Sequence, residues 1–263
     1  VQLMHLNPKP GQHGKLFHRA DIQAQVQEAL PDLPRLIERL GDVLAGPIPD
    51  IAPGEHCRQP RTCAFLDRCI PPPPADATSR LYRLSKKDLA RLLELGHPTI
   101  HTIPDDYPLR PIQDRQRRAI VRGELVLEPA LEGALRAIHR PAAYIDFESI
   151  APAIPAFSDC GPYTQVPVQV SCHHVDLDGT VTHFEWLGQP GEDPRPGLAL
   201  AVLEACHGAE TLVAYSAGFE KQMIRHLKDF VDPDQAAALE ALCHRFVDLL
   251  PIMRSHVYHP DFG

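Results

Sequence analysis

The chain has 263 residues, which is enough for one large domain or two smaller ones that each bury a core. Its hydrophobic fraction of 44% and charged fraction of 23% are ordinary for a globular protein, and no apolar run is long enough to span a bilayer. Residues 1–6 lack the basic start and cleavage site of a secretory signal, so we expect a soluble, cytoplasmic protein. A formal charge of -8 does not favour nucleic-acid binding through bulk electrostatics, so we expect any such contact to come from a local basic patch.

The first 70 residues begin with a predicted strand and a pair of predicted helices. Residues 1–6 alternate between apolar and polar side chains, as in a strand within a sheet. Residues 20–30 and 36–45 carry apolar side chains at helical spacing, and Pro31 and Pro34 separate them. The abrupt start, together with an end at Gly263 that has no closing element, suggests a fragment of a longer protein.

Three of the seven cysteines are clustered, and their spacing suggests a shared ligand. Cys57, Cys63 and Cys69 are separated by five residues each. They could be free thiols, or a zinc site, for which His56 is an awkward fourth ligand because it is adjacent to Cys57. The third interpretation is a [4Fe-4S] cluster whose fourth cysteine lies before residue 1. The remaining cysteines lie among apolar neighbours and predict core positions: Cys160, Cys172, Cys206 and Cys243.

This N-terminal pattern resembles a nuclease family. The strand, the helical pair and the sequence G-x-H-C-x5-C-x-F-x3-C of residues 54–69 are similar to the C-terminal end of RecB-like nucleases of the PD-(D/E)XK class. In the members that carry iron and sulfur, three late cysteines join one early cysteine around a [4Fe-4S] cluster. The resemblance therefore implies that Cys57, Cys63 and Cys69 are iron-sulfur ligands. The acidic and lysine motif of that class would precede Val1, so we do not expect its catalytic site in this chain.

Four consecutive prolines, residues 71–74, mark a stiff connector, and a helical module follows. Ser85 is a predicted N-cap for a helix over residues 86–95 that ends at Gly96. Residues 110–122 are rich in arginine and could either meet phosphate or form a solvated face. The predicted domains are thus a RecB-like C-terminal end (1–70), a linker with a helical module (71–141), and a third domain (142–263) that is incomplete at its C-terminal end.

The most informative stretch of the third domain is Ala-Tyr-Ile-Asp-Phe-Glu-Ser at residues 143–149. Successive strand residues face opposite sides, so Asp146 and Glu148 share one face. Two carboxylates on one face repel unless a cation lies between them, and Mg2+ and Mn2+ take oxygen ligands. The pair therefore suggests a metal site, whereas the alternative is an ordinary solvated strand face.

The rest of the chain predicts an α/β fold. After the Asp-x-Glu strand, residues 166–173 and 181–187 alternate as strands around a turn at Asp178 and Gly179, so three strands can form an antiparallel meander. Helices and a strand then alternate: a helix over 197–207, a strand over 211–215, a helix over 218–227 and a mostly helical stretch over 233–250. Glu220 lies in the first turn of a helix directly after a strand, where it could cap the helix or join a site at the strand's carboxyl end.

These motifs resemble the DEDD exonuclease superfamily, the DnaQ-like branch of the ribonuclease H fold. The D-x-E of Asp146 and Glu148 is similar to its first motif, and the strand, Ser216 and Phe219-Glu220 are similar to its second, with Glu for the usual Asp. A closer similarity is to an uncharacterised exonuclease-like domain fused behind RecB-like nucleases, which shares Y-x-D-F-E, Q-x-S-x-H, F-E-K and V-D-L-L. The last motif contains Asp248. The superfamily's fourth acid is not securely present and would lie past Gly263.

The resemblance implies a fold, a site and a reaction. The fold would be α/β (α+β), with a ribonuclease H-like mixed sheet and flanking helices. Asp146, Glu148 and Glu220 would bind Mg2+ or Mn2+, Asp248 would assist catalysis, and Ser216 and Phe219 would contact substrate. The expected reaction is two-metal hydrolysis of single-stranded DNA or RNA from the 3' end. The alternative is a noncatalytic nucleic-acid-binding or scaffold module with a degenerate site.

Overall fold

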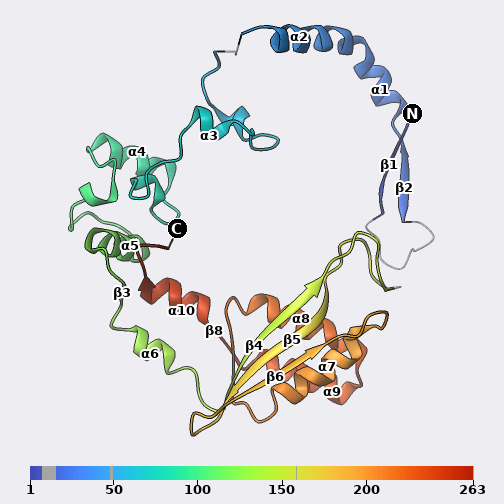
Figure 1. Ribbon diagram of the computed structural model, residues 1–263, viewed down its shortest axis with the longest axis vertical. Coiled ribbons are helices and arrows are strands. Elements are labelled where there is room, and N and C mark those ends of the chain that lie inside the picture. The colour runs from blue at the N-terminus through green and yellow to red at the C-terminus, as the bar shows by residue number, and fades with distance from the viewer. Residues whose placement is uncertain (8–15, 48–49, 158, 263) are drawn as a thin grey trace. The chain divides into compact units, whose positions relative to one another are not determined.

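The structure is a computed structural model that describes residues 1–7, 16–47, 50–157 and 159–262. The chain divides into two compact units: Val1–Pro74 with Ser158–Pro162, and Ala75–Phe157 with Tyr163–Gly263. Figure 1 shows the elements of both units in chain order. Among the described residues, no helix is long and apolar enough to cross a membrane. The three domains that the sequence predicts remain a prediction.

The first unit contains a hairpin and a helical arm. Strand β1 (Gln2–Leu6) pairs antiparallel with β2 (Phe17–Asp21). The predicted opening strand is therefore confirmed, whereas its partner β2 was not predicted. Helix α1 (Gln23–Ala29) continues through a 3-10 turn (Leu30–Asp32) into α2 (Leu33–Ala45). Pro31 lies in the first turn of the 3-10 segment, and Pro34 lies in the first turn of α2. A proline there lacks only an N–H that would have no helical partner, so the chain stays helical across both.

The second unit begins with short helices around a small core. Ser85 caps α4 (Lys86–Glu94) as predicted, since its hydroxyl oxygen accepts a hydrogen bond from the Asp88 N–H at 3.0 Å. Leu81, Leu92, Ile100 and Ile103 form the buried cluster beneath these helices. The other elements are two 3-10 turns (Thr78–Arg80, Ile100–Thr102), α5 (Pro111–Arg122), β3 (Val126–Leu127) and α6 (Leu131–Leu135).

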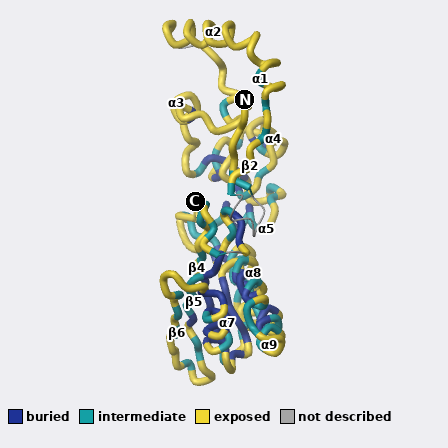
Figure 2. Tube along the Cα trace, turned by 90° about the vertical axis from the view of Figure 1, so that its right-hand side faces the viewer, coloured by how far each residue is buried: buried dark blue, intermediate teal, exposed yellow. Residues whose placement is uncertain are grey.

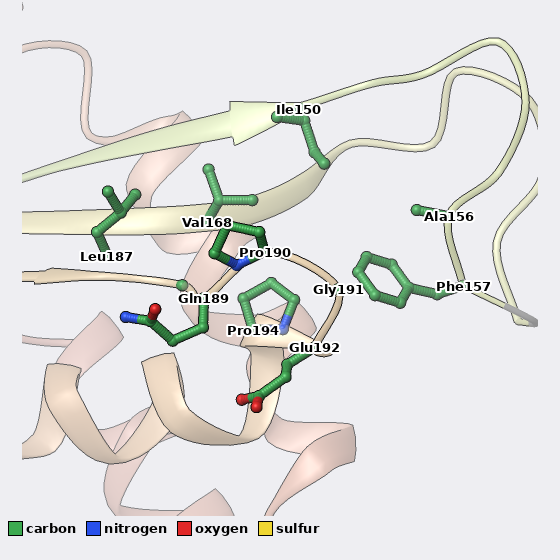
Figure 3. Close-up of a pocket in the computed structure, with 11 residues that line it drawn as sticks. Ile150, Ala156, Phe157, Val168, Leu187, Gln189, Pro190, Gly191, Glu192 and Pro194 are labelled. Carbon is green, nitrogen blue, oxygen red and sulfur yellow. The ribbon is translucent and has the colours of Figure 1, made fainter.

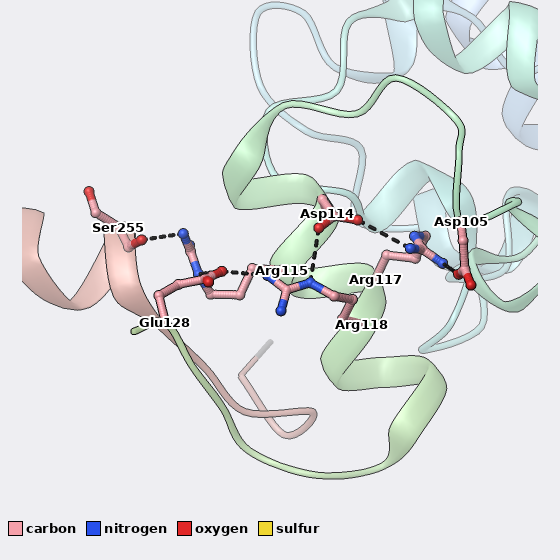
Figure 4. A network of polar contacts seen from close by, with 7 residues as sticks. All are labelled: Asp105, Asp114, Arg115, Arg117, Arg118, Glu128 and Ser255. Carbon is pink, nitrogen blue, oxygen red and sulfur yellow. Dashed lines mark hydrogen bonds and ion pairs between the residues drawn. The ribbon is translucent and has the colours of Figure 1, made fainter. Parts of the chain in front are cut away.

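Arg115 and Arg117 of α5 are buried, so the prediction of a solvated face is wrong for them, while contact with phosphate stays a prediction. Arg115 is 3% exposed and donates to Glu128 at 3.1 Å and to the Arg254 carbonyl at 2.8 Å. Arg118 pairs with the same glutamate and with Asp114, and Arg117 pairs with Asp105 and Asp114 (Figure 4). The carboxylates that neutralise them lie up to 13 residues away in sequence, so residue type alone could not reveal the pairing.

Five strands form the central mixed sheet of the second unit. Their order is β6-β5-β4-β7-β8, with β6, β5 and β4 antiparallel and with β7 and β8 parallel to β4. The predicted meander is therefore confirmed, including its turn, where Gly179 has φ +89° and Asp178 accepts from the Thr180 N–H at 2.8 Å. The strands are β4 (Ala142–Ile150), β5 (Val166–Val175), β6 (Val181–Leu187), β7 (Thr211–Ala214) and β8 (Phe246–Asp248).

Helices α7 (Pro194–Ala205), α8 (Gly218–Leu227) and α9 (Pro233–Cys243) cover one face of this sheet (Figures 1 and 2). The prediction that residues 233–250 are mostly helical is confirmed by α9, but Phe246, Val247 and Asp248 form a strand that it did not include and that pairs with β7. That pairing is a tertiary contact that overrides local preference. Helix α10 (Leu249–His256) follows, and β9 (Val257–Tyr258) then pairs with β3.

The main core lies between the sheet and these helices. Ala143, Ile145 and Phe147 of β4 are each at most 4% exposed and pack in one cluster with residues of α7 and α8. Tyr144, Asp146 and Glu148 alternate with them and are exposed on the uncovered face. Strand β4 thus has an apolar face that holds the fold together and a polar face that is free for chemistry.

Candidate functional site

The Asp-x-Glu pair lies on the face that its spacing predicts. Asp146 is opposite Ser171 and Glu148 is opposite Gln169 on β5, and both carboxylates are exposed. The β4–β5 register shifts immediately after Glu148, so regular pairing is interrupted where the acidic pair ends. Such irregularities bend a strand and redirect the side chains near them.

Asp248 holds the junction between β7 and α8. One of its carboxylate oxygens, Oδ1, accepts from the Ser216 N–H at 2.9 Å and from the Leu250 N–H at 2.9 Å. Ser216 has φ +70°, in the left-handed region that a residue with a side chain rarely adopts. Such a conformation costs roughly 1–3 kcal/mol and persists only where the surroundings enforce it. Asp248 therefore both caps α10 and fixes the turn that leads to Glu220.

Glu220 is the most unusual carboxylate of this region. It is 4% exposed in the first turn of α8. Burial raises the pKa of its carboxyl group, and the negative charges of Asp146 and Asp248 raise it further, while a hydrogen bond to its own backbone opposes the shift. Among the described residues, its buried oxygen Oε2 has no hydrogen-bond partner. The carboxylates of Asp146 on β4 and Asp248 on β8 therefore both oppose ionisation of Glu220 on α8.

The structure brings some of the predicted site residues together but not all. Asp146, Glu220 and Asp248 share one electrostatic environment, and Ser216 is bound to Asp248. Glu148 shares the face of Asp146, but its charge is not among those that act on Glu220. As the side chains lie, no three His, Cys, Asp or Glu residues in the described part of the chain surround a common point as ligands of one metal ion.

Phe219 has a different environment from its polar neighbours. It is half-buried and packs against the core cluster beneath the sheet. Its predicted contact with substrate is not tested and stays a prediction.

Two tyrosines near the acids were not predicted as site residues. Tyr144 shares the open face of β4 with Asp146 and is 38% exposed, and Tyr215 directly precedes Ser216 and is 61% exposed. Strand alternation would have identified Tyr144, because it lies two residues before Asp146. The exposure of Tyr215 depends on where β7 ends, which the sequence does not specify to one residue.

The clustered cysteines lie in the first unit, on a tight hydrogen-bonded segment. The Cys63 N–H donates to the Cys57 carbonyl at 2.8 Å, and the Cys69 N–H donates to the Phe65 carbonyl at 3.3 Å. Cys57 is half-buried and the other two are exposed. Within the described residues the three thiols do not form a ligand group for one ion, so the iron-sulfur cluster stays a prediction. The four scattered cysteines are buried as predicted.

An apolar cavity of about 370 Å³ lies at the end of β4, β5 and β6. Ile150 and Val168 from the sheet and Pro190 and Pro194 from the approach to α7 point into it (Figure 3). Its single acidic lining residue is Glu192, and none of the acids described above lines it. The cavity therefore does not belong to the acidic site.

Comparisons with known proteins give limited information. Residues 143–263 match the model of a family described as "Domain of unknown function (DUF2779)". A comparison with curated proteins found no match. A solved structure, "Exonuclease I (apo)", is similar with 18% identity and a TM-score of 0.29; the match covers 43% of this chain and 30% of that chain. A similarity at this level establishes neither fold nor function.

Proposed function

We propose that residues 142–263 form a metal-dependent nuclease domain with its site at Asp146, Glu148 and Glu220. One observation carries the proposal: the buried carboxylate of Glu220 has an oxygen without a partner among the described residues and faces the charges of Asp146 and Asp248. Burial of an unpaired charge is costly. A divalent cation would offset the repulsion between these carboxylates and would give the buried Oε2 of Glu220 a partner.

The chemistry of these residues fits such an ion. All the candidate donors are carboxylate oxygens, which are the ligands that Mg2+ and Mn2+ prefer. When bound, two such ions would activate a water molecule and stabilise the leaving oxygen of a phosphodiester. Asp146, Glu148 and Glu220 would hold them. Asp248, with Oδ1 occupied by two backbone N–H groups, would position the Ser216 turn.

The finer description of the reaction follows from the family resemblance. A ribonuclease H-like fold is supported by a mixed sheet with the acidic pair on its central strand β4 and with Glu220 opening the helix after β7. On this basis the domain acts as a 3'-to-5' exonuclease on single-stranded DNA or RNA. The first unit, by the same reasoning, is the C-terminal end of a RecB-like nuclease domain.

A second candidate is a noncatalytic module that binds nucleic acid or positions a partner enzyme. It is favoured by the arrangement of the acids, since no three of them surround a common point in the described residues. The two candidates differ in one measurable respect. A nuclease shortens its substrate, whereas a binding module leaves it intact.

The test is an assay of the full chain on 5'-labelled single-stranded DNA and RNA with Mn2+ or Mg2+. We expect stepwise shortening from the 3' end, and we expect Asp146→Asn and Glu220→Gln to reduce the rate by orders of magnitude, because each removes a charged ligand. Glu185→Gln is the matched control, since Glu185 is exposed on β6 of the same sheet. Strands that are bound but remain intact with every metal would favour the noncatalytic module.

A further inference from the structure

We propose that a groove beside α8 binds a nucleotide of the single strand that reaches the acidic site. The groove lies between α8 and residues 163–165, and the ligand class is a phosphate with an unpaired base, in DNA or RNA. The inference rests on the proposed function, and it assigns the path of the substrate, which the acidic cluster by itself does not.

Such a path must be a local basic surface. The chain has a formal charge of -8, and phosphate contacts supply most of the affinity for nucleic acid. Most of the arginines of helix α5 do not provide the surface, because Arg115, Arg117 and Arg118 are paired with carboxylates (Figure 4). Cations elsewhere in the second unit must therefore meet the phosphates.

Helix α8 carries such cations close to the site. Its sequence contains one acid, Glu220, in the first turn, and then Lys221 and Arg225, with Lys228 directly after its last residue. Glu240 of α9 pairs with Lys228 at 2.7 Å and with Arg225 at 3.6 Å. Arg225 and Lys228 share that carboxylate, Lys221 lies over the Phe246 ring instead, and the Arg225 side chain remains 53% exposed. The outer side of α8 is therefore locally positive.

A cavity of about 470 Å³ adjoins this side of the helix. Its polar lining comes from two segments: Gln222, Arg225 and His226 on α8, and Tyr163, Thr164 and Gln165 on the preceding loop. Among the described residues, the buried Nε2 of His226 has no hydrogen-bond partner. The guanidinium of Arg225 and the amide groups of Gln165 and Gln222 are together suited to a phosphate and the polar edge of a base.

Tyr163 supplies the surface on which a base can stack. Its side chain is 63% exposed although its backbone is constrained, with φ +60° and its N–H donated to the Pro152 carbonyl at 2.9 Å. Residues held in a strained backbone conformation cluster at ligand sites. Stacking on such rings binds single strands without regard to sequence.

The position of the groove relative to the acids suits a continuous strand. Arg225 follows Glu220 by five residues on one helix, which corresponds to about 7.5 Å along the axis. That distance is close to the separation of neighbouring phosphates along an extended single strand. A strand whose end lies at Glu220 could therefore place a neighbouring phosphate beside Arg225 and its base on Tyr163.

The experiment measures binding separately from cleavage. Fluorescence anisotropy with short labelled oligo-dT and oligo-U, in EDTA and over a series of salt concentrations, reports affinity for the full chain and its variants. We expect Tyr163→Ala to weaken binding roughly 5- to 150-fold and Tyr163→Phe to retain it, because a phenyl ring still stacks. Arg225→Gln should reduce the slope of log affinity against log salt by about 0.7, which corresponds to one lost phosphate contact. Lys87→Ala, an exposed cation on α4, should change neither quantity.

The outcomes distinguish this inference from the nuclease proposal. If Tyr163→Ala and Arg225→Gln both bind as tightly as the wild-type protein, the groove is not the path, whereas cleavage that still depends on Asp146 leaves the acidic site intact. If the variants lose binding but the wild-type protein never cleaves, the groove stands and the nuclease proposal fails. If the wild-type protein binds neither oligonucleotide at low salt, the proposal that the groove binds a single strand is wrong.

Discussion

The replacement Glu220→Gln tests the central claim about the acidic cluster without any substrate. In the wild-type protein the pKa of Glu220 is raised by burial and by the charges of Asp146 and Asp248. A neutral amide of nearly the same shape removes the repulsion and the buried negative charge. We therefore expect the metal-free variant to be more stable than the wild-type protein at neutral pH.

The sign and size of this effect follow from proton linkage. The folded state binds the Glu220 proton more tightly than the unfolded chain does, so wild-type stability falls as the pH rises from the ordinary glutamate value of 4.5 through the raised native pKa. At pH values above the raised native pKa, each pKa unit of the shift lowers the free energy of unfolding by about 1.4 kcal/mol. A buried polar atom without a partner costs about 1–3 kcal/mol. Since 1 kcal/mol changes Tm by about 2–4 °C in a protein of this size, the variant should melt about 2–12 °C higher in EDTA.

In the presence of Mn2+ the wild-type protein should be more stable than the Glu220→Gln variant. An ion that binds only the folded protein adds about 2.7 kcal/mol at a concentration of 100 Kd, and the variant should lose most of that gain together with its ligand. The assay is thermal unfolding from pH 4 to 9, in EDTA and in Mn2+, with Glu185→Gln as a control whose effect should stay within about 0.5 kcal/mol. A Glu220→Gln variant that is less stable than wild type in EDTA, or that gains as much from Mn2+, would refute the reasoning.

Three further predictions concern the structure around the site and the first unit. Asp248→Ala should cost about 0.5–2 kcal/mol in urea unfolding, because it removes the cap of α10, and Asp248→Asn should cost less; equal losses would count against the hydrogen bonds. Gly197→Ala should cost about 1–3 kcal/mol, because the added Cβ would lie 2.8 Å from Trp186 Cζ2, whereas Gly133→Ala, with no atom within 4 Å, should not be destabilising. A longer chain that supplies the fourth cysteine, purified without oxygen, should absorb visible light through an iron-sulfur cluster and lose that absorbance in Cys63→Ser, whereas residues 1–263 alone should hold iron poorly; bound zinc without iron in the longer chain would contradict the cluster.

The sequence by itself determined the local features of this protein. Alternation placed Asp146 and Glu148 on one face of a strand, because the side-chain period of a strand is fixed by its geometry. Ser85 identified a helix start, and Asp178 with Gly179 identified a turn, because their side-chain and backbone preferences act within a few residues. These patterns also predicted the antiparallel meander that begins the sheet.

Only the tertiary structure decided which distant groups meet. Strand β8 forms because β7 is available to pair with it, and that pairing carries Asp248 to the turn before Glu220. For Arg115, Arg117 and Arg118 of α5 the sequence left phosphate contact and a solvated face both open, and only the structure shows that they pair with Asp105, Asp114 and Glu128. A charge is neutralised or left free by neighbours in space, and those neighbours come from segments whose approach is set by packing of the whole unit.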